Sequence, residues 1–202
     1  MSTLSALQSL LSRYLGATYI YNPDQQTAAL NYARKHILLN YYVDEFAVQA
    51  TLTLTTGRAS IPSDYLRHVK LYDSSDTEYQ RVNVNNFDKD TSQTWTIKDS
   101  SGTRYIYIYP TTATSLTLRY LKLPTDMSAT SDLSYFPAYF DDAHCAVAAW
   151  WLLNNDRQPE AQNKLAAYEE MLQTALRHQA EESEDYPVIE TIYDQDIKLF
   201  DN

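Results

Sequence analysis

The period of the hydrophobic pattern changes twice along this chain, and this change constrains the fold more than any other feature. Before residue 43 and after residue 136, apolar residues recur at the spacing of amphipathic helices. Between residues 47 and 124 they alternate with polar residues, which predicts half-buried strands. We therefore expect an α+β fold, in which helices from both ends of the sequence form one bundle around an inserted antiparallel β-sheet block.

Helical spacing predicts four helices, over residues 3–15, 23–42, 137–154 and 159–180. Gly16 is a natural stop for the first helix, and Asn22 followed by Pro23 is a typical capped start for the second. The third helix is apolar on nearly every side and includes Trp150 and Trp151, so we expect it to be the buried centre of the subunit. The last two helices should pack as an antiparallel hairpin.

The central block carries the signals of hairpins. Residues 99–102 separate two alternating segments, 95–98 and 105–109, which predicts a hairpin. Because both faces of the second segment are bulky, we expect a central strand that is covered on both sides, with residues 116–120 paired beside it. The block should be a sheet of about five strands in hairpin or meander order. Residues 79–91 could form a strand that leads into a short helical turn.

Composition excludes several classes of protein. Hydrophobic residues make up 44% of the 202 residues, which indicates a globular body. The only cysteine, Cys145, rules out an internal disulfide framework and suits a reducing compartment. Three glycines are too few for a Gly-rich phosphate loop. No apolar run is long enough to span a bilayer, and the start lacks the basic region of a secretory signal peptide, so we expect no membrane partner.

The negative charge is concentrated at the C-terminus. Residues 181–202 contain eight acidic side chains and one basic one, against a net charge of −10 for the whole chain. A solvated acidic tail is one interpretation of this segment. Its apolar content favours another, an extended segment that docks on a partner, beyond a body of residues 1–180. The expected contacts are Ile189, Ile192, Tyr193, Ile197 and Phe200.

The residues that could carry chemistry each have a structural explanation. His144 and Cys145 are adjacent, so on a helix they point about 100° apart and suit a buried structural thiol better than a metal site. Asp141 and Asp142 lie in the first turn of the predicted third helix, where negative charge is favourable. His178 and Glu182 are one helical turn apart and should form a solvated pair. We expect no catalytic site, no cofactor and no metal.

Tyr105, Tyr107 and Tyr109 fall on one face of a predicted strand and could form a platform for stacking nucleic-acid bases. Such platforms need basic residues to hold phosphates. Arg104 and Arg119 are the only nearby candidates, and the chain is acidic overall. We therefore interpret the tyrosines as residues that pack under helices or neighbouring subunits.

Several short motifs occur in an order that resembles the head-to-tail adaptor (head-completion or connector) proteins of tailed bacteriophages. Residues 61–67 read Ile-Pro-Ser-Asp-Tyr-Leu-Arg, and residues 107–110 read Tyr-Ile-Tyr-Pro. They are followed by a Leu-x-Leu-x-Tyr strand with a later proline at residues 116–124, and by Phe-Pro-Ala-Tyr-Phe-Asp at residues 136–141. The closing helix contains Ala-Ala-Tyr-Glu-Glu at residues 166–170. The resemblance extends to about residue 180.

This resemblance implies a structural virion protein without enzymatic activity. It implies a ring, usually of twelve copies, that binds beneath the portal protein, extends the DNA channel and offers a platform for the tail or the next neck protein. DNA would pass through without specific binding, and the ring would be assembled in the cytoplasm of the host bacterium. The C-terminal segment would reach the portal. The alternative is a protein- or nucleic-acid-binding module without a capsid role.

Overall fold

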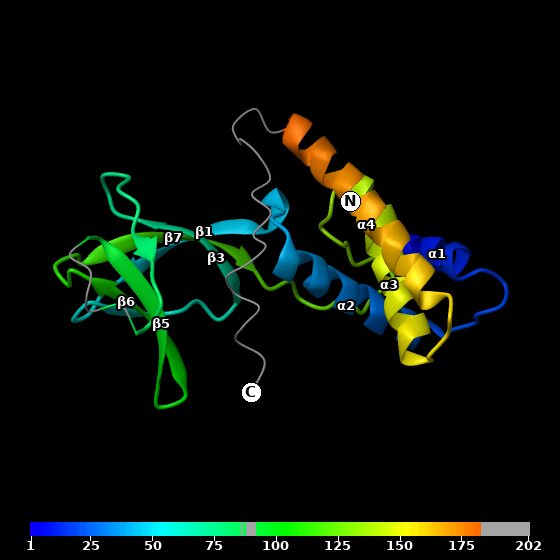
Figure 1. The fold of residues 1–202 in the computed structure, drawn as a ribbon, viewed down its shortest axis with the longest axis horizontal. Coiled ribbons are helices and arrows are strands. Elements are labelled where there is room, and N and C mark those ends of the chain that lie inside the picture. The colour runs from blue at the N-terminus through cyan, green and yellow to red at the C-terminus, as the bar shows by residue number, and fades with distance from the viewer. Residues whose placement is uncertain (86, 88–91, 183–202) are drawn as a thin grey trace. The chain divides into compact units, whose positions relative to one another are not determined.

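The computed structural model describes residues 1–85, 87 and 92–182, which belong to two compact units (Figure 1). The helical unit comprises Met1–Val43 and Thr125–Asn202, and the β unit comprises Asp44–Pro124. Both helices and sheets are present, so the α+β class is confirmed. Within the described part of the chain, no helix is both long and apolar enough to cross a membrane.

The helical unit contains α1 (Leu4–Leu15), α2 (Pro23–Asn40), α3 (Asp141–Asn155) and α4 (Ala161–Glu182). The caps explain the boundaries of the first two helices. The backbone N–H of Gly16 closes α1 by donating to Ser12, and Asn22 and Gln25 form a capping box at the start of α2. Helix α2 ends two residues before its expected end, and a 3₁₀ turn (Ala138–Phe140) delays the start of α3.

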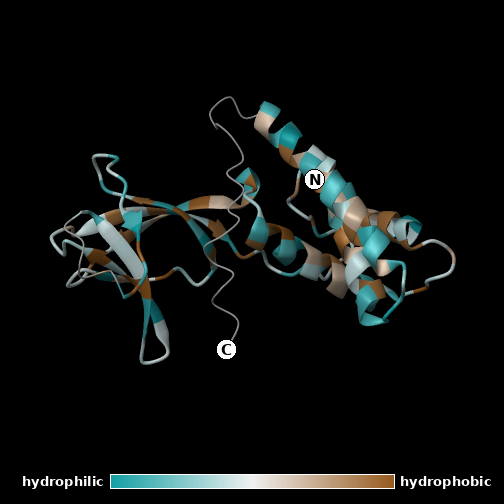
Figure 2. Cartoon of the chain, viewed as in Figure 1, coloured by the Kyte–Doolittle hydropathy of each residue, from teal (hydrophilic) through white to brown (hydrophobic). Residues whose placement is uncertain are grey.

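Helix α3 packs against α1, α2 and α4, and small side chains allow this close approach. Ala143, Ala146 and Ala149 are fully buried on it. Helix α3 is largely buried, as expected, but its two tryptophans, Trp150 and Trp151, are only half-buried. Helices that approach this closely leave no room for an indole, so both tryptophans lie at the margin beside Tyr32 of α2. Figure 2 shows α4 as largely hydrophilic along its length, which fits a helix that covers the unit with one side.

The β unit contains two sheets, whereas the sequence predicted one. The first has the order β1-β7-β3, and the second has the order β2-β6-β5-β4. The strands of these two sheets are β1 (Ala47–Thr53), β2 (Arg58–Ser60), β3 (Tyr65–Tyr72), β4 (Gln80–Arg81), β5 (Thr94–Ser100), β6 (Thr103–Tyr109) and β7 (Ser115–Lys122). A short 3₁₀ turn (Asp44–Phe46) precedes β1.

The predicted meander was wrong in two respects. Strand β7 pairs with β1 and β3, not with β6, and β4 pairs with β5 in the parallel sense. Alternation fixes which face of a strand is buried but not which strand lies beside it. The apolar faces of the two sheets share one core, to which Leu52, Leu71 and Leu118 contribute from the first sheet and Trp95, Ile106 and Ile108 from the second.

The β5–β6 hairpin was predicted correctly. Its turn residues, Ser101 and Gly102, both have positive φ, the conformation of the tight turns that suit the twist of a hairpin. Strand β6 lies inside its sheet as expected, but only its isoleucine face is covered. In the 79–91 stretch, β4 is two residues long, and residues 86 and 88–91 lie outside the described residues.

Candidate interaction surfaces

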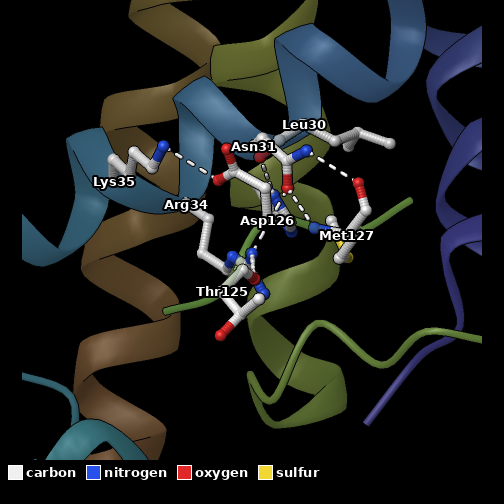
Figure 3. Close-up of polar contacts among 8 residues, drawn as sticks. Leu30, Asn31, Arg34, Lys35, Thr125, Asp126 and Met127 are labelled. Atoms are coloured by element: carbon white, nitrogen blue, oxygen red, sulfur yellow. Dashed lines mark hydrogen bonds and ion pairs between the residues drawn. The ribbon is translucent and has the colours of Figure 1, made fainter. Parts of the chain in front are cut away.

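Three polar side chains of α2 hold the chain where it re-enters the helical unit (Figure 3). Asn31 pairs with the backbone of Met127 in both directions: its Nδ2 donates to the carbonyl and its Oδ1 accepts from the N–H, each at 2.9 Å. Arg34 donates to the carbonyl oxygen of Thr125 and to Asn31 Oδ1. Lys35 forms an ion pair with Asp126 at 2.8 Å. We call these contacts between α2 and residues 125–127 the return clamp.

The return clamp contains a buried charge. Arg34 has no exposed surface, and its Nε and Nη1 have no hydrogen-bond partner among the residues that the structure describes. Burial therefore lowers the pKa of the guanidinium, although the nearby Asp126 carboxylate opposes this shift. Because a buried charge with unmet donors costs free energy, the guanidinium of Arg34 is a weak source of stability within the clamp. A hollow of about 550 Å³ lies beside it, lined by α2 and residues 126–128.

His144 and Cys145 are buried in the helical unit. His144 Nε2 lies 2.8 Å from the backbone oxygen of Leu30, so the neutral ring donates this hydrogen bond. Burial lowers the pKa of His144 to about 4 and raises the pKa of the Cys145 thiol well above its usual range. The thiol points to the carbonyl of Leu7. Among the described residues no three His, Cys, Asp or Glu side chains are grouped as metal ligands, and this pair suits packing.

The acidic residues at the start of α3 take the position that the sequence predicted. Asp141 and Asp142 occupy its first turn, where they meet the positive end of the helix dipole. Asp141 accepts a hydrogen bond from Ser2, and Asp142 accepts one of 3.0 Å from Tyr14. Burial raises the pKa of both Asp141 and Tyr14. These contacts join the N-terminal segment and α1 to α3, and they give each carboxylate a structural partner.

Three tyrosines and two cations share the outer face of the four-stranded sheet, which we call the tyrosine face. Tyr105, Tyr107 and Tyr109 alternate with the buried isoleucines of β6. The Arg58 guanidinium lies 5.2 Å from the centre of the Tyr105 ring, and the Lys98 ammonium lies 5.5 Å from that of Tyr107. Within the described part of the chain Tyr109 is 38% exposed and the other two are half-buried, so these tyrosines do not pack under helices. Their packing under neighbouring subunits stays a prediction.

The cations of this face are not those that the sequence suggested. Arg104 lies near Asp99, and Arg119 lies in the other sheet near Asp44. Arg58 and Lys98 reach the tyrosines diagonally from the neighbouring strands β2 and β5. Arg58 is nearly fifty residues away in sequence, so proximity along the chain could not find it. The one available signal was the hairpin at residues 95–109, whose register aligns Lys98 with Tyr105.

Two of the quoted motifs meet in the β unit. Asp64 of the Ile-Pro-Ser-Asp-Tyr-Leu-Arg motif accepts a 2.8 Å hydrogen bond from Tyr120 of the Leu-x-Leu-x-Tyr strand. Burial and this bond raise the pKa of Tyr120 to about 12. The backbone oxygen of Asp64 also accepts from the N–H of Leu123. The motif thus fixes the loop before β3 to the end of β7.

The family model for the SU10 adaptor protein matches residues 2–191, which include both units. The chain belongs to the SU10 adaptor protein family. This is a family of phage head–tail adaptors, so the resemblance seen in the motifs is confirmed. No curated protein matches the chain at a significant level.

Membership in the SU10 adaptor protein family indicates a structural role at the head–tail junction, in the neck of a virion. It suggests a non-enzymatic protein that interacts with portal and tail components. The Asp64–Tyr120 contact gives a physical reason for two motifs that carried the resemblance. The hydrogen bond between Asp64 and Tyr120 joins the two motifs, so both residues help to hold the loop before β3 in place.

The predicted docking residues of this adaptor lie outside the described residues. They are Ile189, Ile192, Tyr193, Ile197 and Phe200. Just before them, His178 lies 3.7 Å from Glu181, whereas the side chain of its expected partner, Glu182, lies outside the described part of the chain. The last buried side chain of α4 is Leu176, so the packed part of this helix ends before the acidic segment begins.

Proposed function

We propose that this chain forms a ring beneath the portal, of twelve copies as the resemblance implies, that connects a phage capsid to its tail and extends the DNA channel. The observation that carries the proposal is the family match over residues 2–191. The contacts of Asp141, Asp142 and Tyr120 described above support it, because these polar groups hold segments of the fold together. The ring is assembled in the cytoplasm of the host bacterium and offers a platform for the tail or the next neck protein.

The charge of the chain suits a channel through which DNA slides without specific binding. Residues 1–180 contain 18 acidic and 15 basic side chains, too few cations to line a lumen with positive charge. Each lasting Lys or Arg contact with phosphate adds salt-dependent affinity, which hinders passage. We therefore infer that acidic or neutral side chains line the lumen.

The acidic C-terminal segment is the proposed anchor to the portal. Its net charge of −7 over residues 181–202 steers it toward a basic surface, and its apolar side chains provide the burial that holds it there. A tail that serves only solubility needs no Ile189, Ile192 or Phe200. We therefore infer that the apolar residues make the lasting contacts with the portal, and that the carboxylates steer the segment toward it.

Co-sedimentation with portal-containing capsids tests this function. The full chain should sediment with capsids, and a chain truncated after Ala180 should not. The truncated chain should keep its thermal midpoint, since the buried stripe of α4 ends at Leu176. A matched full-length variant with Ile189, Ile192, Ile197 and Phe200 changed to serine keeps the tail charge, and it should also fail to bind.

The opposite matched variant has the acidic residues of the tail changed to their amides. It should bind more slowly but stay bound, because the apolar contacts persist. If the truncated chain binds capsids as well as the full chain does, the C-terminal segment is not the anchor to the portal. If the full chain binds DNA at moderate salt and has no affinity for capsids, the proposed function is refuted. The alternative, a nucleic-acid-binding module, then takes its place.

A further inference from the structure

The two sheets of the β unit differ in their outer faces. On the three-stranded sheet this face combines the exposed small side chains of Thr51, Thr53 and Ser115 with the larger side chains of Arg119, Lys70 and Tyr72, and it carries one tyrosine from β3 and β7 rather than a row of three. On the four-stranded sheet it carries the tyrosine face. Tyrosine and arginine are enriched at protein interfaces, whereas threonine and serine are ordinary on solvated strands. The tyrosine face therefore has the composition of a contact surface.

The two cations of the tyrosine face, Arg58 and Lys98, have no acidic partner among residues 1–85, 87 and 92–182. Arg58 is exposed, whereas Lys98 is partly covered by the ring of Phe87, 4.7 Å from its ammonium. Because these two cations have no carboxylate partner among the described residues, a partner surface with negative charge complements them.

The helical unit has the complementary charge. Residues 1–43 and 125–182 contain eleven acidic and six basic side chains, whereas residues 44–124 contain nine of each. A hollow of about 260 Å³ on this unit is lined by Tyr139, Asp142, Glu170, Met171 and Thr174. Its two carboxylates form no ion pair among residues 1–85, 87 and 92–182. The hollow thus offers two acceptors and an apolar floor to a guanidinium.

We propose that the tyrosine face docks on the helical unit of a second copy of this chain, with Arg58 entering the hollow between Asp142 and Glu170. Because one copy uses its β unit and the next its helical unit, the contact is head-to-tail and can repeat until a ring closes. This inference rests on the proposed ring. It identifies the surfaces by which neighbouring copies recognise each other.

Nucleic acid is the less suitable occupant. The affinity of a protein for a phosphate backbone grows with the number of phosphates that it neutralises, and the tyrosine face offers two cations. The β unit as a whole has equal numbers of acidic and basic residues. An acidic protein surface with apolar side chains, such as the one around the hollow at Asp142 and Glu170, complements both the rings and the cations.

Photo-crosslinking on assembled particles tests the contact directly. A benzophenone side chain at Tyr107 of the full chain, bound to portal-containing capsids, should crosslink to a peptide of α4 or of the α3 start in a second copy. Mixing isotopically labelled and unlabelled copies separates crosslinks between copies from those within one. The same probe at Thr51, on the outer face of the other sheet, should give no such product.

Charge reversal tests the pairing. Arg58→Glu should weaken association between copies by about tenfold or more, seen as fewer copies bound per capsid and in sedimentation velocity of the concentrated chain. Lys70→Glu, an equal change at an exposed site beside Glu78, should have little effect. Arg58→Glu combined with Glu170→Arg should restore association. All three substituted side chains are exposed, so the variants should melt like the parent chain.

The outcomes separate this inference from the proposed function. If the parent chain binds capsids but Tyr107 crosslinks to the portal, to DNA or to nothing, the head-to-tail contact is refuted while the adaptor role stands. Unchanged association of Arg58→Glu refutes it equally. If the parent chain does not bind capsids, the proposed function fails, and sedimentation velocity of the same variants still decides whether copies associate through these surfaces.

Discussion

Asn31→Leu is the change that tests the return clamp most directly. Leucine has a similar volume but cannot pair with the backbone of Met127, so a buried N–H and a buried C=O lose their partners. Each unsatisfied buried group costs about 1–3 kcal/mol, and the greater burial of leucine offsets a part of this. We therefore expect a loss of about 3 kcal/mol from the unfolding free energy, a large share of the roughly 5–15 kcal/mol that stabilises a domain.

Asn40→Leu is the matched control. Asn40 is exposed at the end of α2, and its Nδ2 donates to the carbonyl of His36 within the same helix. The same substitution there should change stability by no more than about 0.5 kcal/mol.

Chemical denaturation followed by circular dichroism at a helical wavelength is the assay, because all four long helices of the described residues belong to the helical unit. If Asn31→Leu unfolds at the same denaturant concentration as Asn40→Leu, the clamp contributes nothing to this unit. That result would refute the reasoning from buried polar pairs.

Two further changes test other parts of the structure. The pKa of His144 is about 4 in the fold, below the roughly 6.5 of an unfolded histidine, so its contribution is complete above pH 6.5 and is lost as pH falls toward 4. The loss should be about 3 kcal/mol, and denaturation of His144→Gln across that range should show a flatter profile because glutamine does not titrate. Gly57→Ala should destabilise the β unit more than Gly102→Ala in thermal melts. Both glycines have positive φ, but a Cβ at Gly57 would lie 2.5 Å from a methyl group of Thr111, and nothing lies within 4 Å at Gly102. Equal melting of the two variants contradicts the steric argument.

Local features of this chain could be predicted because their causes are local. A cap such as Asn22 or Gly16 acts on backbone groups a few residues away, and the β5–β6 turn depends on two consecutive residues with positive φ. The family motifs also lie in short segments. The helices, the hairpin, the absence of recognisable catalytic motifs and the adaptor resemblance therefore follow from the sequence.

Tertiary structure decided the features that depend on distant residues. The alternation of apolar and polar residues predicted that one face of β7 is buried. Which strands pair with β7 depends instead on how the two sheets share one core, and these strands are β1 and β3. His144 is fully buried, whereas Trp150, a larger and more hydrophobic side chain of the same helix, is only half-buried, because close helix packing leaves room for the smaller ring alone. Asn31 is an ordinary polar residue of a helix until residues 125–127 return to it. Its role, like that of Arg58 beside Tyr105, exists only where the folded chain brings separate segments within hydrogen-bond or ring-contact distance.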